Sequence, residues 1–275
     1  MTEFRPGRFE ILPFVIKNLL IINALVFLAQ MTFDGSNGGW LTDTFALHNI
    51  KSSLFKPHQL FTYMFMHGSF AHLFFNMFAV WMFGSTLENY WGPKKFLTYY
   101  IITGLGAAAM HLAVLYFENA ALINDLNLFK SHPTFSNYMH LYNKYGLGAL
   151  SDQFVQLAKG WMGNPSSYEF SIQAIDYFSS FTDAYLSVPT VGASGSVFGL
   201  LAAFGYLFPN SYVYFYFLFP MKAKWFVLLY AGLELFAGIR NSAGDNVAHF
   251  AHLGGALVGF LLVYAWNKLD RKNFY

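Results

Sequence analysis

A serine and a histidine that could together carry out acyl transfer stand in two separate apolar stretches of the chain. Ser194 lies in the sequence Gly192-Ala-Ser-Gly195, at the start of the apolar residues 191–208, and His252 lies within residues 247–266. A serine hydroxyl is a weak nucleophile until an adjacent base removes its proton, and histidine is the side chain most often used for that task. The pair can act only if the fold brings the hydroxyl and the imidazole together.

The glycines that follow these two residues predict how the two stretches meet. Gly195 and Gly199 are four residues apart, and Gly255 and Gly259 come three and seven residues after His252. Residues at i, i+3 and i+7 share one helical face, and small residues on such a face allow two helix backbones in lipid to come close. Packing of the two glycine faces would place the serine beside the histidine. A serine among glycines is by itself more often a packing feature, but the joint occurrence favours catalysis.

A second pair of polar residues could stabilise the negative charge that acyl transfer develops on a carbonyl oxygen. His72 and Asn76 are four residues apart in the apolar segment 60–84, so they share a helical face. An asparagine amide aimed at the reacting carbonyl is a known kind of oxyanion donor. Hydrogen bonding between helices is the alternative role for both side chains.

The apolar stretches indicate that the solvent of this protein is lipid. Of its 275 residues, 56% are hydrophobic and 11% are charged, whereas a soluble domain has about 25% charged residues. A membrane-spanning helix needs about 20 mostly apolar residues. The candidate spans are Phe14–Met31, Leu60–Gly84, Phe96–Phe117, Val191–Phe208, Trp225–Ile239 and Val247–Trp266. We therefore expect an all-α polytopic membrane protein with six transmembrane helices.

The placement of lysine and arginine predicts the orientation of the chain. With the N-terminus inside, ten of the sixteen basic residues fall in short inner segments, which is the side that basic residues favour. Both termini would then be cytoplasmic, and we expect a multi-pass protein of the bacterial cytoplasmic (inner) membrane. The net charge of +2 gives no indication of nucleic-acid binding, and the lack of cysteine excludes disulfides and thiolate metal sites.

One more polar segment, residues 118–190, separates the third candidate span from the fourth. Residues Ser151 to Trp161 follow a helical pattern that ends at Gly163-Asn-Pro165, and residues Ile172 to Phe181 follow a second one. We expect two short amphipathic helices at the membrane surface here. The chain is thus predicted to form a single membrane domain, residues 1–275, with 118–190 as an insert on the outer side.

Four motifs together resemble those of the rhomboid family of intramembrane proteases. They are His67-Gly-Ser-Phe-Ala-His72-Leu-Phe-Phe-Asn76-Met77, Glu88-Asn-Tyr-Trp91-Gly92, Gly192-Ala-Ser194-Gly195 and Ala248-His249-Phe-Ala-His252-Leu-Gly-Gly255-Ala-Leu-Val-Gly259. The six expected spans fall in the family's order, so the resemblance covers nearly all of the chain outside 118–190. It implies a rhomboid-like helical bundle and an intramembrane serine endopeptidase that cuts in or near the transmembrane helix of its substrates.

The resemblance also implies roles for individual residues. Ser194 would be the nucleophile and His252 the general base, as a dyad without a carboxylate. His72, Asn76 and the backbone N–H of Ser194 would hold the oxyanion. Phe198, one turn after the nucleophile, would stack on the ring of His252.

Two further polar residues stand near the expected site. His249 is not favoured as the base, because only His252 has glycines three and seven residues later. Glu234, in the fifth candidate span, could pair with His249, and we expect that hydrogen bond to be structural. The expected partners are the lipid bilayer and a transmembrane protein substrate, with no cofactor, metal or nucleic acid.

Three alternative functions remain open from the sequence. A non-catalytic rhomboid-like protein that binds membrane clients is disfavoured by the presence of both Ser194 and His252. A membrane metal oxidase could use His67 with His72, and His249 with His252, but carboxylates are scarce in the apolar stretches. A channel or transporter would explain polar groups that line a cavity, although it gives no reason for the matched placement of serine and histidine.

Overall fold

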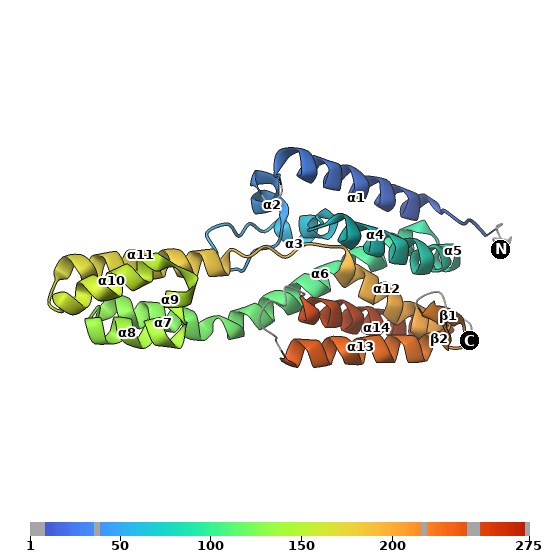
Figure 1. Ribbon diagram of the computed structural model, residues 1–275. Coiled ribbons are helices and arrows are strands. Elements are labelled where there is room, and N and C mark those ends of the chain that lie inside the picture. Colours follow the sequence, from blue (N-terminus) through green and yellow to red (C-terminus); the bar gives the residue numbers. More distant parts are fainter. Residues whose placement is uncertain (1–8, 36–38, 216–218, 241–247, 273–275) are drawn as a thin grey trace. The chain divides into compact units, whose positions relative to one another are not determined.

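The structure is a computed structural model that describes residues 9–35, 39–215, 219–240 and 248–272, most of them helical (Figure 1). The α-helices are α1 (Phe14–Phe33), α2 (Trp40–Phe45), α3 (Gln59–Thr62), α4 (Phe70–Ala79), α5 (Ser85–Trp91), α6 (Pro93–Glu118), α7 (Ala120–Ser131), α8 (Phe135–Lys144), α9 (Leu147–Leu150), α10 (Asp152–Gly163), α11 (Tyr168–Leu186), α12 (Ser194–Leu207), α13 (Ala223–Arg240) and α14 (His249–Lys272). A 3-10 helix, η1 (Tyr63–Phe65), precedes α4, and a π-helix, η2 (Val80–Gly84), joins α4 to α5.

Two short strands and two compact units complete the architecture. Strands β1 (Tyr212–Phe215) and β2 (Phe219–Lys222) form an antiparallel hairpin. The first unit comprises residues 1–47, 56–114 and 189–275, and the second comprises residues 48–55 and 115–188. The second unit therefore includes nearly all of the polar segment 118–190.

Four helical stretches within the described residues are long and apolar enough to cross a membrane. They are Phe14–Phe33, Phe70–Trp91, Pro93–Glu118 and His249–Leu269. The helix α12 is apolar but has only 14 residues, and α13 carries the charged residues Lys224, Glu234 and Arg240. A mostly helical protein with apolar candidate spans is thus confirmed, while the six-span count remains a prediction.

The helix α12 forms the buried centre of the first unit. Every residue from Gly195 to Ala203 is buried, and α12 packs against α13 and α14 (Figure 1). Hydrogen bonds connect it to α6: the Tyr99 hydroxyl donates to the carbonyl of Gly199 at 2.7 Å, and the Ser196 hydroxyl donates to the carbonyl of Tyr100 at 2.8 Å. In a low-dielectric interior such bonds are needed, since an unpaired backbone group is costly there.

A buried carboxylate fixes the start of α1 against α5. Glu88 is 3% exposed, and its two oxygens accept hydrogen bonds from the backbone N–H groups of Val15 and Ile16, each at 2.9 Å. These N–H groups lie in the first turn of α1, where no helical partner exists for them. The negative charge also complements the positive end of the helix dipole.

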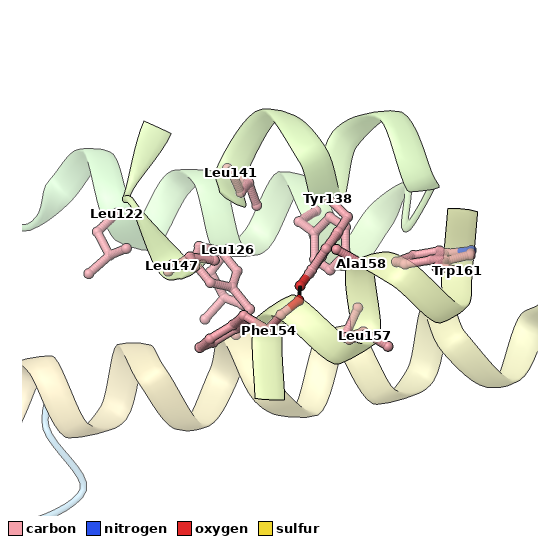
Figure 2. Packing of buried hydrophobic residues seen from close by; sticks show 12 residues of the cluster. Leu122, Leu126, Tyr138, Leu141, Leu147, Phe154, Leu157, Ala158 and Trp161 are labelled. Atoms are coloured by element: carbon pink, nitrogen blue, oxygen red, sulfur yellow. Dashed lines mark hydrogen bonds between the residues drawn. The ribbon is translucent and has the colours of Figure 1, made fainter. Parts of the chain in front are cut away.

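The second unit has its own apolar core, built from helices α7 to α11 (Figure 2). Trp161 is 1% exposed, and the Tyr138 hydroxyl donates to the carbonyl of Phe154 at 2.7 Å. The predicted helix from Ser151 to Gly163 is confirmed as α10, with the Ser151 hydroxyl capping its first turn. The prediction of only two helices in this segment is wrong, because α7 and α8 pack their apolar faces onto the same core.

The second predicted helix of this segment is also present, and its predicted apolar face is buried in part. Helix α11 buries Ser171, Ala174, Phe178 and Thr182, whereas Ile172 is 41% exposed. Small residues at 171 and 174 allow α11 to lie close to its neighbours, while Phe178 fills the core and Ile175 and Phe181 pack against it. The apolar pattern thus predicted the helix correctly and its orientation only in part.

Candidate active site

Ser194 stands at the first position of α12, after a turn that requires glycine. Gly192 has φ of +127°, a conformation that L side chains rarely adopt, and its N–H donates to the carbonyl of Tyr63 at 2.9 Å. A β-carbon at position 192 would lie only 2.7 Å from the ring of His72. The turn leaves the backbone N–H of Ser194 in the first turn of the helix, where it has no intrahelical acceptor.

His252 lies in the first turn of α14, and its ring reaches the serine. The Nε2 atom of His252 is 2.8 Å from the Oγ atom of Ser194. Both side chains are half-buried. The distance is within the range of a hydrogen bond, so the hydroxyl can donate its proton directly to the imidazole.

Two pairs of glycines hold α12 and α14 together at this point. A β-carbon on Gly255 would lie 1.9 Å from the carbonyl oxygen of Gly195, and one on Gly259 would lie 2.8 Å from the Cα atom of Gly199. No larger residue fits at either position without moving a backbone. The glycine faces that the sequence indicates therefore face each other, and the close approach brings His252 to Ser194.

Phe198 supports the imidazole from α12. Its ring is stacked on that of His252, with centroids 4.5 Å apart and planes inclined by 7°. The same phenyl ring is stacked on Tyr230 at 5.0 Å. Phe198 is 5% exposed, so the stack restricts rotation of the His252 ring about its side-chain bonds.

Asn76 and His72, on α4, present two hydrogen-bond donors near the serine. Asn76 is 6% exposed, and its Nδ2 has no hydrogen-bond partner among the residues that the structure describes. The backbone N–H of Gly68 donates to His72 Nδ1 at 3.5 Å, which leaves Nε2 to carry the ring hydrogen. A β-carbon on Gly192 would be 2.7 Å from that Nε2 and 3.6 Å from the Asn76 Nδ2, so both nitrogens face the turn before Ser194.

The structure places a carboxylate in contact with both histidines, whereas the sequence predicts its pairing with His249 alone. The Oε2 atom of Glu234, on α13, is 2.6 Å from His249 Nδ1 and 2.9 Å from His252 Nδ1. The pairing with His249 is confirmed. The expectation of a serine–histidine pair without a carboxylate is wrong, because Glu234 lies within hydrogen-bond distance of His252. The signal in the sequence was an acidic residue inside an apolar stretch, which is a candidate functional residue by default.

These three side chains are also the group of described residues best arranged to ligate a cation. The ligand atoms of Glu234, His249 and His252 all lie within 4.8 Å of one another. Glu234 Oε2 lies within hydrogen-bond distance of the Nδ1 atoms of both histidines. His67 and His72, the other pair suggested for a metal oxidase, contact each other ring to ring with centroids 5.1 Å apart.

Comparison with known proteins finds eukaryotic relatives. The chain is 26% identical over 263 residues to RHOMBOID-like protein 12, mitochondrial, of Arabidopsis thaliana, which covers 94% of the chain and 60% of the relative. It is 24% identical over 202 residues to Rhomboid protein 1, mitochondrial, of Saccharomyces cerevisiae, which covers 74% of the chain and 39% of the relative. An uncharacterized mitochondrial rhomboid protein of Schizosaccharomyces pombe is 25% identical over 237 residues, which covers 82% of the chain and 56% of the relative. The chain thus spans about two-fifths to three-fifths of the length of these relatives.

The names of these relatives correct the expected location. All three are mitochondrial proteins of eukaryotes, so the assignment to a bacterial inner membrane with both termini in the cytoplasm is wrong. An excess of basic residues indicates the orientation of a protein in its membrane, but it does not indicate which membrane that is.

A match to a family model agrees with the four sequence motifs. The model of the Rhomboid domain matches residues 55–122 and 154–268, which is more than half of the chain. The matched segments contain His72 and Asn76 in the first, and Ser194 and His252 in the second. The chain belongs to the rhomboid family.

Proposed function

We propose that this protein is an intramembrane serine endopeptidase in which Ser194 is the nucleophile and His252 the general base. The observation that carries the proposal is the 2.8 Å contact between Ser194 Oγ and His252 Nε2. Members of the rhomboid family are generally intramembrane serine proteases. A serine hydrogen-bonded to a supported histidine is the minimal arrangement for nucleophilic acyl transfer.

The chemistry would proceed in two steps. Ser194 Oγ attacks the carbonyl carbon of the scissile peptide bond while His252 Nε2 accepts its proton. The tetrahedral intermediate collapses, the amine of one fragment leaves with the proton from His252, and the other fragment remains as an ester on Ser194. Water then attacks the ester with the same base, which releases the second fragment and restores the hydroxyl.

Three donors would stabilise the oxyanion of both tetrahedral intermediates. The Nδ2 of Asn76 is buried without an acceptor among the described residues, and the Nε2 of His72 faces the same turn. The backbone N–H of Ser194 is the third donor. Donors that are held in place before the reaction stabilise developing charge without having to reorganise.

The setting of the reaction follows from the same proposal. We place the protein in a mitochondrial membrane, because its relatives are named as mitochondrial proteins, with six spans and residues 118–190 as an insert on the outer side of one rhomboid domain. Its substrates would be transmembrane proteins whose helix unwinds easily near the outer end, because a helical peptide bond is shielded by its own hydrogen bonds. The reaction requires no cofactor, metal or nucleic acid.

A serine-directed fluorophosphonate probe tests this function. Purified protein in lipid vesicles should become covalently labelled, and Ser194→Ala should abolish labelling. His252→Ala should also abolish it, although Ser194 is still present, because the serine then lacks its base. Ser196→Ala is the matched control, because Ser196 lies on the same helix and its hydroxyl is committed to the carbonyl of Tyr100 at 2.8 Å. Unlabelled wild-type protein that still binds transmembrane clients would support the non-catalytic alternative instead.

A further inference from the structure

We propose that Glu234 is a positioning residue that fixes the tautomer of His252 and stabilises its protonated form, with His249 holding the carboxylate in place. The inference rests on the proposed function of Ser194 and His252. It would extend the serine–histidine pair to a hydrogen-bonded chain of Ser194, His252, Glu234 and His249, formed by residues of α12, α13 and α14.

The hydrogen-bond pattern determines where the ring hydrogens lie. Glu234 Oε2 lies 2.9 Å from His252 Nδ1 and 2.6 Å from His249 Nδ1. An ionised carboxylate only accepts hydrogen bonds, so each of these Nδ1 atoms must carry a hydrogen. The Nε2 of neutral His252 then has its lone pair directed at Ser194 Oγ, which is the tautomer that a general base needs. With the hydrogen on Nε2 instead, the ring could not accept the serine proton.

The charge of Glu234 matters once His252 has accepted that proton. The imidazolium would then be a cation in a half-buried site, where an unpaired charge is costly. Glu234 is 8% exposed, and its carboxylate already touches the opposite edge of the ring. The ion pair forms fully only as the proton is transferred, so it stabilises the transition state more than the bound substrate. Loss of the carboxylate should therefore lower kcat.

His249 keeps the carboxylate in its charged and oriented form. His249 and His252 are three residues apart on α14, so their rings project from one face of the helix. The second N–H on the same oxygen compensates for the water that a buried carboxylate lacks. His249 Nδ1 lies 2.6 Å from Glu234 Oε2, and its ring lies edge-on to that of His252, with centroids 6.5 Å apart. Removal of His249 should therefore act through Glu234 and be milder than removal of Glu234 itself.

A purely structural role for Glu234 would be to tie α13 to α14. Such a role predicts lower thermal stability when the bonds are removed. It also predicts that each molecule that remains folded turns over at the normal rate. The two roles therefore separate when kcat, KM and melting temperature are measured on the same preparation.

The decisive comparison uses two substitutions of different severity. Glu234→Gln keeps a hydrogen-bond acceptor and removes the charge, and Glu234→Leu removes both at similar volume. Replacing the aspartate of a soluble serine–histidine–aspartate site by its amide lowers kcat about 10⁴-fold, so we expect a loss between about 10-fold and 10⁴-fold, larger for Leu than for Gln. KM should change by less than about 3-fold. Glu169→Gln, the same change at an exposed position of α11, is the control.

The measurement should be made per active site, by titration with the fluorophosphonate probe, so that unfolded protein is not counted. Wild-type kcat in Glu234→Gln and Glu234→Leu, with or without a lower melting temperature, would overturn the positioning role. If Glu234→Leu does not fold, the amide variant alone decides. Full turnover by Ser194→Ala would instead refute the proposed function. Inactive Ser194→Ala together with fully active Glu234→Leu would refute only this inference.

Discussion

Asn76 combines two properties that are rare together in a structural asparagine. Its side chain is buried, and its amide nitrogen has no acceptor within the described part of the chain. Buried donors without partners are uncommon in folded proteins. A donor that is left unpaired beside a nucleophile is expected where a substrate oxygen is to be bound.

Asn76→Ala should therefore lower kcat more than it raises KM. Removal of one oxyanion donor typically costs about 100- to 1,000-fold, near 3–4 kcal/mol, because the carbonyl oxygen needs its donors most when it carries charge. His72→Ala should be less severe, since Asn76 and the Ser194 N–H remain. Single-turnover cleavage measured beside the melting temperature tests this. A large loss of stability with unchanged chemistry would remove Asn76 from the site.

At the residue scale the sequence predicts most of the candidate site but not Glu234. The motifs around Asn76, Ser194 and His252 indicate the arrangement that the structure shows, because spacing along one helix determines which residues share a face. Glu234 reaches His252 only through the packing of α13 against α14. That contact depends on the relative rotation of two helices, which spacing within either one does not determine.

At the scale of elements, the glycine contacts between α12 and α14 position the reacting atoms. Gly259→Leu should separate the two helices, because even a β-carbon would lie 2.8 Å from the Gly199 Cα atom. We expect activity to fall at least about 10-fold without any change to a reacting group, by analogy with other small displacements of catalytic groups. Gly255→Leu should behave in the same way.

Gly232→Leu is the matched control for this substitution. It introduces the same side chain into α13, at a glycine with no atom within 4 Å of its added β-carbon. Cleavage by Gly259→Leu at the rate of Gly232→Leu would show that the close contact is not needed to align Ser194 and His252.

The helices of the second unit show which elements an apolar sequence pattern can predict. The pattern from Ser151 to Trp161 predicts α10, because a capping serine precedes residues that bury every third or fourth position. The sequence patterns described above do not predict α7 or α8. Their buried positions include Leu126 and Tyr138. These side chains are buried because they pack on the core that α7 and α8 share with α10 and α11.

At the scale of the whole molecule, all candidate site residues belong to the first of the two compact units. Trp161→Ala should destabilise the second unit by about 3–5 kcal/mol, the usual cost of removing a buried aromatic side chain, since Trp161 is 1% exposed. Hydrogen exchange should then increase together in α7 to α11, while fluorophosphonate labelling of Ser194 stays near the wild-type rate.

Tyr168→Ala, which removes a 78% exposed aromatic side chain from α11, is the control for that experiment. It should leave both exchange and labelling unchanged. Loss of labelling in parallel with the loss of protection in α7 to α11 would mean that the two units fold as one.

The account as a whole depends on Ser194 being the nucleophile. The most direct test is the cleavage of a single-span substrate by purified wild-type, Ser194→Ala and His252→Ala protein in lipid vesicles. Each single variant should lose cleavage while its helical content and melting temperature are retained. The double variant should be little worse than either, because the two side chains act as a unit. Appreciable turnover by the folded Ser194→Ala protein would contradict the account.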